Sequence, residues 1–312
     1  MVDQESAKRA LVIAATGGHG ALMTGPPGAG KTMLAKRLPT ILPPLDEAEA
    51  LEAMLVHSVC SLPVDEIAMG RRPFRAPHHA ITLAGLVGGG NPVTPGEASL
   101  AHGGVLFLDE LPEFSPSVLQ SLRQPMEEGE IRLVRADGTY SFPSRFQLLA
   151  AANPCPCGHF GDRGHVCRCS PSQIARYQAR VGGALMDRID VFVDVTRPAA
   201  SNVIKGAKGM SSAEMRAQVL RGREFASWRS SKTEFAQPGS VESCLLSDGA
   251  QSLLELMAER LSLGGRAISR TARVARTIAD LAERESVEAD DIAEACAFRS
   301  RYALEDDLNG SS

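Results

Sequence analysis

Residues 25–32 form the most specific chemical pattern in the chain. They read Gly-Pro-Pro-Gly-Ala-Gly-Lys-Thr and fill each fixed position of the pattern G-x-x-x-x-G-K-[ST]. In such a loop the backbone N–H groups surround phosphate oxygens, the lysine reaches the β- and γ-phosphates, and the Ser/Thr hydroxyl holds Mg²⁺. The sequence therefore predicts that a nucleoside triphosphate is bound by Gly25, Pro26, Pro27, Gly28, Ala29, Gly30, Lys31 and Thr32.

Two carboxylates follow the apolar run at residues 105–108, which reads Val-Leu-Phe-Leu before Asp109 and Glu110. Ligands of open α/β sheets bind at the carboxyl ends of the strands, where these acids would lie. We expect Asp109 to complete the Mg²⁺ shell with Thr32, and Glu110 to polarise the attacking water. The alternative is a pair of surface acids after a strand. Glu110 is the residue that favours a hydrolase over a passive nucleotide switch.

Asn153 follows a further apolar run at residues 146–151. Its side chain could bind the γ-phosphate or the attacking water from the neighbouring strand end. An asparagine before a proline, here Pro154, is also a common turn former, so this alternative remains open.

Short apolar runs separated by helical or loop segments must position these residues. The runs at residues 21–23, 105–108, 146–151 and 191–195 suit buried parallel strands and predict a doubly wound α/β sheet. A fifth strand near Phe74 is a weaker prediction, because Pro73 and Pro77 restrict it.

Composition changes along the chain predict three parts. Residues 1–200 would form the nucleotide-binding core, residues 201–245 a linker with a helical insertion at 213–230, and residues 246–312 a helical domain with three apolar helix faces. Residues 237–243 read as a break, and residues 306–312 as a frayed tail.

The composition is that of an ordinary globular protein, with 312 residues, 44% hydrophobic and 22% charged. The net charge of −4 excludes a globally basic surface, so any contact with nucleic acid must use local basic residues. No secretory signal or membrane span is visible, which predicts a cytoplasmic location and no membrane partner.

Four of the seven cysteines lie in one short loop, Cys155, Cys157, Cys167 and Cys169. The spacing is C-x-C, nine residues, then C-x-C, and four thiolates on a loop that folds back at its glycines suit tetrahedral Zn²⁺. Reduced cysteines without a metal are the alternative. His159 and His165 are either substitute ligands or solvated loop residues. The remaining cysteines, Cys60, Cys244 and Cys296, are expected to be buried thiols.

The order of these segments resembles the AAA+ superfamily, which also places an arginine finger where residues 185–188 read Leu-Met-Asp-Arg. Residues 75–79, 95–97, 101–104, 153–158 and 273–281 further resemble the magnesium-chelatase-like ComM/YifB family. The resemblance extends from Ala7 to about Tyr302. It implies an AAA+ αβα sandwich with a five-stranded parallel sheet and a small helical lid. Family members carry an additional Lon-S5-like N-terminal domain, so this chain is expected to be a short form or a fragment.

This resemblance implies a homo-oligomeric ring of six subunits with ATP and Mg²⁺ at each interface. Arg188 would then act on the neighbour's nucleotide, although an ion pair with Asp187 or Asp190 is the alternative. Arg266 resembles the second sensor, whose arginine contacts the γ-phosphate. Arg270 and Arg273 on the same helix are the other candidates.

Two segments resemble the loops that this branch projects into the ring pore. Residues 71–95 resemble the helix-2 insert and residues 130–144 the presensor β-hairpin. We expect single-stranded or branched DNA to contact Arg75, His78, His79, Arg132 and Arg135. Exposed hairpin charges and packed histidines are the alternatives.

The family resemblance then implies an ATP-driven DNA translocase, a branch-migration helicase of natural transformation. A chelatase-type motor that drives metal insertion by a partner, and a nucleotide-gated scaffold, are the other hypotheses.

Overall fold

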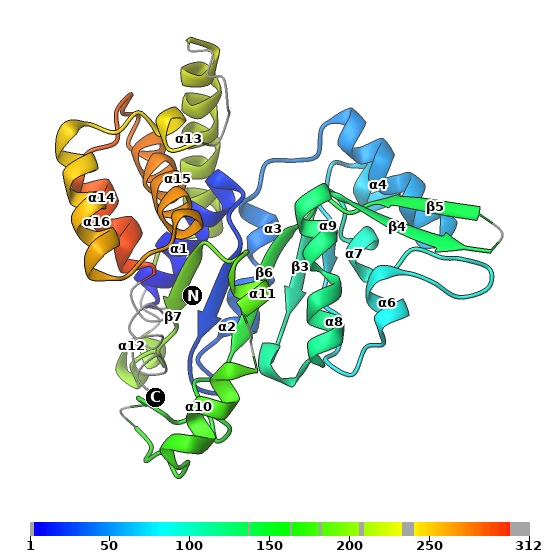
Figure 1. Ribbon diagram of the computed structural model, residues 1–312, viewed down its shortest axis with the longest axis horizontal. Coiled ribbons are helices and arrows are strands. Elements are labelled where there is room, and N and C mark those ends of the chain that lie inside the picture. The colour runs from blue at the N-terminus through cyan, green and yellow to red at the C-terminus, as the bar shows by residue number, and fades with distance from the viewer. Residues whose placement is uncertain are drawn as a thin grey trace.

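A five-stranded parallel sheet forms the centre of the protein (Figure 1). The computed structural model describes residues 3–136, 138–162, 164–180, 183–205, 209–232 and 240–299. The strands run in the order β2-β3-β6-β1-β7, with bounds β1 (Ala21–Thr24), β2 (Phe74–Arg75), β3 (Val105–Leu108), β6 (Gln147–Ala152) and β7 (Val191–Asp194). The predicted α/β fold with five parallel strands is confirmed. The strand near Phe74 is present but only two residues long, as the flanking prolines would impose.

Alternate residues of each strand face opposite sides of the sheet, and both sides are apolar. In β3, Val105 and Phe107 join one buried cluster, whereas Leu106 and Leu108 join the other. A parallel sheet covered on both faces requires such continuous apolar runs, which explains why they are visible in the sequence.

One face of the sheet packs against α1 (Glu5–Gly17) and α3 (Leu38–Ile41), with α13 (Ser212–Lys232) beyond them (Figure 1). The same buried cluster continues into the helical C-terminal region, made of α14 (Asp248–Arg260), α15 (Gly265–Leu281) and α16 (Ala289–Ala297). The edge strand β7 also meets this region, because the Phe192 N–H donates to the Phe298 carbonyl at 2.7 Å. The predicted helical lid is therefore present and shares its core with the sheet.

Helix α13 packs more closely than a linker would. A Cβ atom at Gly222 would lie 2.9 Å from Leu281 Cδ2 and 3.0 Å from Thr16 Cγ2, so the helix touches both α15 and α1. Arg223 of α13 donates to the Ala15 carbonyl at 2.6 Å. The division of the chain at residues 200 and 245 stays a prediction, but α13 belongs to the packed core. The predicted tail at 306–312 and residues 237–239 of the predicted break at 237–243 lie outside the described residues.

The other face of the sheet is covered by short helices and turns. These are α6 (Leu83–Val87), α7 (Glu97–Leu100), η1 (Leu111–Glu113), α8 (Pro116–Ser121), α9 (Arg123–Glu128) and α11 (Gly183–Met186). Beyond them stand α4 (Glu47–Val59) and α5 (Asp65–Ala68), which close a small apolar cluster of their own. The remaining elements are α2 (Lys31–Ala35), α10 (Pro171–Ala179), α12 (Ala200–Ile204) and η2 (Glu242–Cys244).

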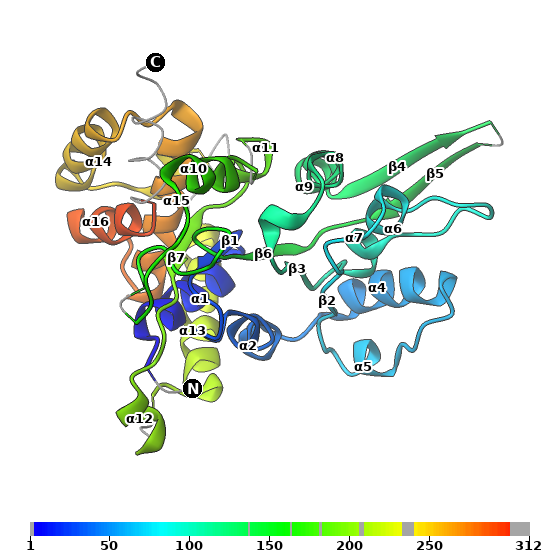
Figure 2. The same ribbon diagram turned by 90° about the horizontal axis from the view of Figure 1, so that it is seen from below.

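An antiparallel hairpin of β4 (Glu130–Arg135) and β5 (Gly138–Pro143) projects from the sheet on the side away from the C-terminal helices (Figures 1 and 2). The segment around α6 projects beside it. A Cβ atom at Gly88 would lie 3.4 Å from Leu133 Cδ1, and one at Gly89 would lie 3.2 Å from an Arg135 guanidinium nitrogen. The two segments predicted to face a pore are therefore packed against each other.

Two smaller predictions concern the isolated cysteines and the membrane. Cys244 and Cys296 are buried, whereas Cys60 is only partly buried, so the prediction of three buried thiols is wrong for Cys60. Within the described residues, every helix is too short or too polar to cross a bilayer.

Candidate nucleotide-hydrolysis site

The ends of three neighbouring strands bring the predicted nucleotide residues together. The phosphate loop leaves β1, Asp109 and Glu110 follow β3, and Asn153 follows β6. Lys31 Nζ donates to Asn153 Oδ1 at 3.0 Å, and Thr32 Oγ1 donates to Asp109 Oδ2 at 2.7 Å. Hydroxyl and carboxylate oxygens are the ligands that Mg²⁺ prefers, so this pair suits the predicted metal shell.

Glycines give the phosphate loop its shape. Gly28 and Gly30 have φ angles of 78° and 95°, which side chains disfavour. Gly25 donates its N–H to the Ala152 carbonyl at 3.2 Å. A Cβ atom at Gly25 would lie 2.1 Å from the Val195 carbonyl oxygen, so a larger residue would force the loop away from the sheet.

The Lys31 ammonium group is held inside the loop by oxygen acceptors. Besides Asn153, it donates to the carbonyls of Gly25 at 2.5 Å and Pro26 at 3.2 Å. Burial lowers the pKa of Lys31, while the nearby charges of Asp109 and Glu110 raise it in part. The two carboxylates therefore help to keep a buried lysine charged where phosphate oxygens are expected.

Glu110 has an unusual backbone and an unexpected partner. Its φ angle is 53°, its side chain is 54% exposed, and its Oε2 lies 3.3 Å from His79 Nδ1. His79 also packs edge-on to Phe114 and lies against His78, with ring centroids 4.1 Å apart. The sequence alone assigns His79 to DNA, but the structure places it at the candidate catalytic carboxylate. The only signal in the sequence for this position of His79 is that Pro77 and His78 precede it, which favours an ordered turn.

Arg75, another predicted DNA contact, is engaged within the subunit. Its guanidinium group donates twice to Glu97, through Nε and Nη2, both at 2.6 Å. This hydrogen bonding to Glu97 raises the pKa of Arg75 despite burial. The partly buried bidentate pair holds helix α7 against β2, so Arg75 has a structural partner within the subunit, and its contact with DNA stays a prediction.

Arg188 forms an ion pair with Glu127 of α9, rather than with the predicted alternatives Asp187 or Asp190. Its Nε is buried without a hydrogen-bond partner among the described residues. Burial lowers the pKa of Arg188, and so do the nearby charges of Arg270, Arg266 and Arg123. Arg188 therefore lies within a group of arginines that repel one another.

The three candidates for the second sensor differ in their surroundings. Arg270 Nε and Arg273 Nη2 each lie 3.7 Å from Asp190 Oδ1, and the Arg270 side chain is only 8% exposed. The Arg266 side chain is 68% exposed and lies 3.9 Å from Asp187. Arg266 is thus the most exposed of the three, and its assignment as the second sensor stays a prediction.

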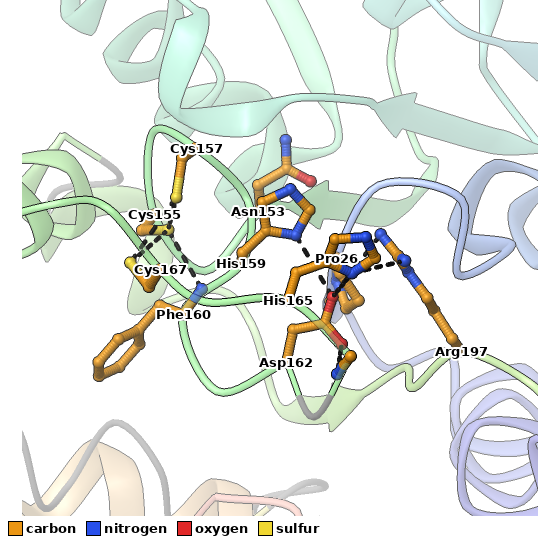
Figure 3. Close-up of polar contacts among 12 residues, drawn as sticks. Pro26, Asn153, Cys155, Cys157, His159, Phe160, Asp162, His165, Cys167 and Arg197 are labelled. Atoms are coloured by element: carbon orange, nitrogen blue, oxygen red, sulfur yellow. Dashed lines mark hydrogen bonds and ion pairs between the residues drawn. The ribbon is translucent and has the colours of Figure 1, made fainter.

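The four loop cysteines converge on one point, and Figure 3 shows three of them, Cys155, Cys157 and Cys167. The Sγ atoms of Cys155, Cys157 and Cys167 are 3.4, 3.7 and 3.6 Å apart, and Cys169 Sγ lies within 4.8 Å of them. A tetrahedral Zn²⁺ with Zn–S bonds of about 2.3 Å requires sulfur separations of about 3.8 Å. Backbone N–H groups of Arg168 and His159 lower the pKa of Cys157 to about 6. The Cys169 N–H lowers the pKa of Cys167, but burial and the hydrogen bonds to Cys157 and Cys155 outweigh it and raise that pKa to about 12. The sulfur geometry of the cluster is therefore what suits a structural zinc site.

This cysteine loop rests directly on the phosphate loop. Gly158, with a φ angle of 80°, lies so close to Pro27 that a Cβ atom there would be 2.6 Å from Pro27 Cδ. Pro154, between Asn153 and Cys155, accepts a hydrogen bond from Gln178 Nε2 at 3.2 Å. The wall of the nucleotide site and the candidate zinc loop are thus one continuous segment.

A parallel sheet with the phosphate loop after β1, the acidic pair after β3 and an asparagine after β6 defines an AAA+ P-loop protein. Residues 1–203 match the family described as magnesium chelatase, subunit ChlI, and residues 209–299 match its C-terminal region. The chain belongs to this magnesium chelatase ChlI family of AAA+ ATPases.

Several proteins are similar to the chain over nearly its whole length. It is 44% identical over 307 residues to competence protein ComM of Haemophilus influenzae and 42% identical over 303 residues to protein YifB of Salmonella typhimurium. These alignments cover 97% and 96% of the chain, but 60% of each relative. Magnesium-chelatase 67 kDa subunit of Heliobacterium mobile is 29% identical over 192 residues, which are 52% of the chain and 28% of that protein. The predicted family is confirmed.

Packing of the cysteine loop on Pro27 predicts different effects for two glycines. Gly158→Ala should weaken binding of a fluorescent ATP analogue about tenfold, because the added methyl group collides with Pro27 in the phosphate loop. Gly161→Ala is the matched control, since Gly161 has a similar φ angle of 74° but open space around it. Equal affinities of the two variants would show that this contact does not shape the nucleotide site.

Proposed function

We propose that the chain is the ATP-hydrolysing subunit of a ring-forming motor that moves DNA. The proposal of ATP hydrolysis rests on one observation. Lys31 contacts Asn153 and Thr32 contacts Asp109, beside Glu110. Mg²⁺ held by Thr32 and Asp109 would neutralise charge on the β- and γ-phosphates. Glu110 accepts a proton from the water that attacks the γ-phosphorus, and Asn153 orients that water.

Replacement of the proton acceptor tests this assignment. Glu110→Gln should bind ATP as the wild type does and hydrolyse it about 10²- to 10⁴-fold more slowly, because an amide cannot take the proton. Phosphate release and analogue binding are measured in parallel. Glu113→Gln, which changes an exposed acid of η1, is the control and should retain the rate. Hydrolysis at the wild-type rate by Glu110→Gln would contradict the role of Glu110.

Arg188 is proposed to act on the nucleotide of the neighbouring subunit. Its ion pair with Glu127 is partly exposed, so the guanidinium can exchange one anionic partner for another when a γ-phosphate is offered across an interface. Arg266, Arg270 and Arg123 repel Arg188, and this favours the exchange, because the anionic γ-phosphate would relieve the repulsion among the arginines. Hydrolysis would then depend on ring assembly, which we propose to be hexameric.

Mixed rings distinguish action in trans from action within the subunit. Arg188→Ala and Lys31→Ala should each reduce hydrolysis by about 10³-fold or more, and mixing them should restore part of it by rebuilding complete interfaces. Mixing Lys31→Ala with Glu110→Gln is the control, because both changes fall on the same side of the interface. Oligomer size is measured by sedimentation. An absence of recovery in assembled mixed rings would contradict the action of Arg188 in trans.

DNA contacts are proposed on the hairpin of β4 and β5 together with the adjoining insert. Arg132 and Arg135 are exposed there, although Arg132 also pairs with Glu130, and Arg135 lies beside Gly89 of the insert. The insert leads back through His78 and His79 to Glu110. This path supports coupling between DNA on the hairpin and hydrolysis at the sheet edge. A chain with net charge −4 would use such a local basic strip to follow a phosphate backbone.

Substitution of the hairpin arginines should uncouple DNA from hydrolysis. In Arg132→Ala/Arg135→Ala, stimulation of ATP hydrolysis by single-stranded or branched DNA should fall at least about fivefold, and the salt dependence of DNA binding should become less steep. Arg221→Ala is the control, because Arg221 is an exposed arginine on α13, away from the hairpin (Figure 1). Unchanged stimulation would exclude the hairpin as the DNA contact.

The similarity to competence protein ComM supports branch migration in natural transformation as the role of this motor. The similarity to the magnesium-chelatase 67 kDa subunit supports a second candidate, a motor that drives metal insertion by a partner protein. Stimulation of hydrolysis by branched DNA favours the first, and stimulation only by a protein partner favours the second. Binding of ATP without turnover in assembled rings would instead indicate a nucleotide-gated scaffold.

Zinc is proposed as a structural ion held by Cys155, Cys157, Cys167 and Cys169. The support is their mutual sulfur distances and the N–H groups that donate to sulfur, from Phe160 to Cys155 at 3.3 Å and from Cys169 to Cys167 at 3.5 Å. Such outer donors are typical of bound thiolates. The ion would fix the loop that rests on Pro27, and so would stabilise the nucleotide site from outside.

A further inference from the structure

Three other side chains of the cysteine loop meet at a second point, His159, Asp162 and His165 (Figure 3). His159 Nδ1 and His165 Nδ1 each lie 3.3 Å from Asp162 Oδ2, and the three ligand atoms are within 4.8 Å of one another. The two imidazole rings are stacked, with centroids 4.7 Å apart and an interplanar angle of 23°. These residues lie between the two C-x-C arms and share no side chain with the cysteine cluster.

Their spacing is that of ligands around one ion. Zinc bonds of about 2.0–2.1 Å to nitrogen and oxygen place neighbouring tetrahedral ligands about 3.3–3.4 Å apart, as observed here between each imidazole and the carboxylate. Asp162 is fixed by a backbone contact, because its Oδ1 accepts the Gly164 N–H at 3.0 Å and its side chain is only 7% exposed. The other oxygen, Oδ2, is thereby directed at the two imidazoles.

Space for an ion and a further ligand is present beside them. A cavity of 360 Å³ is lined by these three side chains and by Gly161, Gly164, Val166 and Cys167. Two imidazoles, one carboxylate and an open position form a ligand set that suits Zn²⁺ and similar divalent transition ions.

Arg197, just beyond β7, contacts the same histidine and aspartate side chains and so would compete with a metal ion for them. Its Nη1 donates to His165 Nδ1 at 3.0 Å, and its Nη2 lies 3.6 Å from Asp162 Oδ2. The guanidinium group therefore supplies positive charge beside the carboxylate and covers the nitrogen that a metal would need. Its side chain is partly exposed, so it can turn away into solvent when an ion enters.

We propose that His159, Asp162 and His165 form a second site for a divalent transition metal, distinct from the cysteine site. The ion binds through Nδ1 of both histidines and Oδ2 of the aspartate, with its remaining position open to the cavity, and Arg197 lowers its affinity by competition. Both sites lie on the loop that packs against Pro27. The second ion therefore holds the middle of that loop in place, as the cysteine site holds its two ends. Binding of this ion requires neither ATP hydrolysis nor DNA.

Metal content of the full chain tests the second site. Protein loaded with Zn²⁺ and dialysed against metal-free buffer should hold two ions per chain, and His159→Ala/His165→Ala should hold one. His57→Ala, which removes a histidine outside the loop, should still hold two. Loading with Co²⁺ assigns the sites, because only thiolate ligands give sulfur-to-cobalt charge-transfer bands, and these should persist in the double histidine variant.

Arg197→Gln should bind the second ion about tenfold more tightly, because it removes a charged hydrogen-bond donor from His165. One ion per wild-type chain that is retained in the double histidine variant would overturn the second site and leave the cysteine site intact. One ion that is lost with the histidines, without charge-transfer bands, would support the second site and overturn zinc binding by the cysteines. Analogue binding by each variant verifies that the chain is folded.

Discussion

The parallel pairing of β3, β6 and β1 is the constraint on which the rest of the structure depends. Leu108 lies opposite Ala150 and Thr24 lies opposite Ala152, so the three carboxyl ends finish within a few residues of one another. Carboxyl ends of parallel strands meet at one edge, and this edge collects the phosphate loop, the acidic pair and Asn153. A slip of one residue in any pair would move the side chains of one strand to the opposite face of the sheet and separate these groups.

The segment after β6 contributes both to the nucleotide site and to the cysteine loop, because the residues of the two follow one another directly in the chain. Asn153 faces Lys31, and two residues later Cys155 begins the cysteine loop. The loop returns to the phosphate loop at Gly158, where only a glycine allows its backbone to approach Pro27. Ions bound by this loop would therefore act on the nucleotide site through packing, without touching a phosphate group.

The acidic pair at the end of β3 is connected to the hairpin of β4 and β5, away from the cysteine loop. Glu110 contacts His79, and the insert that follows His79 packs on the hairpin through Gly88 and Leu133. The hairpin is the most protruding part of the described chain (Figures 1 and 2). A ligand on the hairpin could thus shift the carboxylate through a short series of contacts. The αL backbone of Glu110 is a sparsely populated conformation of the kind that clusters at active sites.

The sequence by itself determined the phosphate loop, four of the strands and the cysteine cluster, because each depends on residues close together in the chain. Tertiary structure decided which partners distant charges take. Arg188 pairs with Glu127, Arg75 pairs with Glu97, and His79 meets Glu110, although the sequence offered other partners or DNA for each. It also decided that Arg270 and Arg273 face Asp190 while Arg266 stays exposed. Long charged side chains have many partners of similar energy, and only the packed fold selects among them.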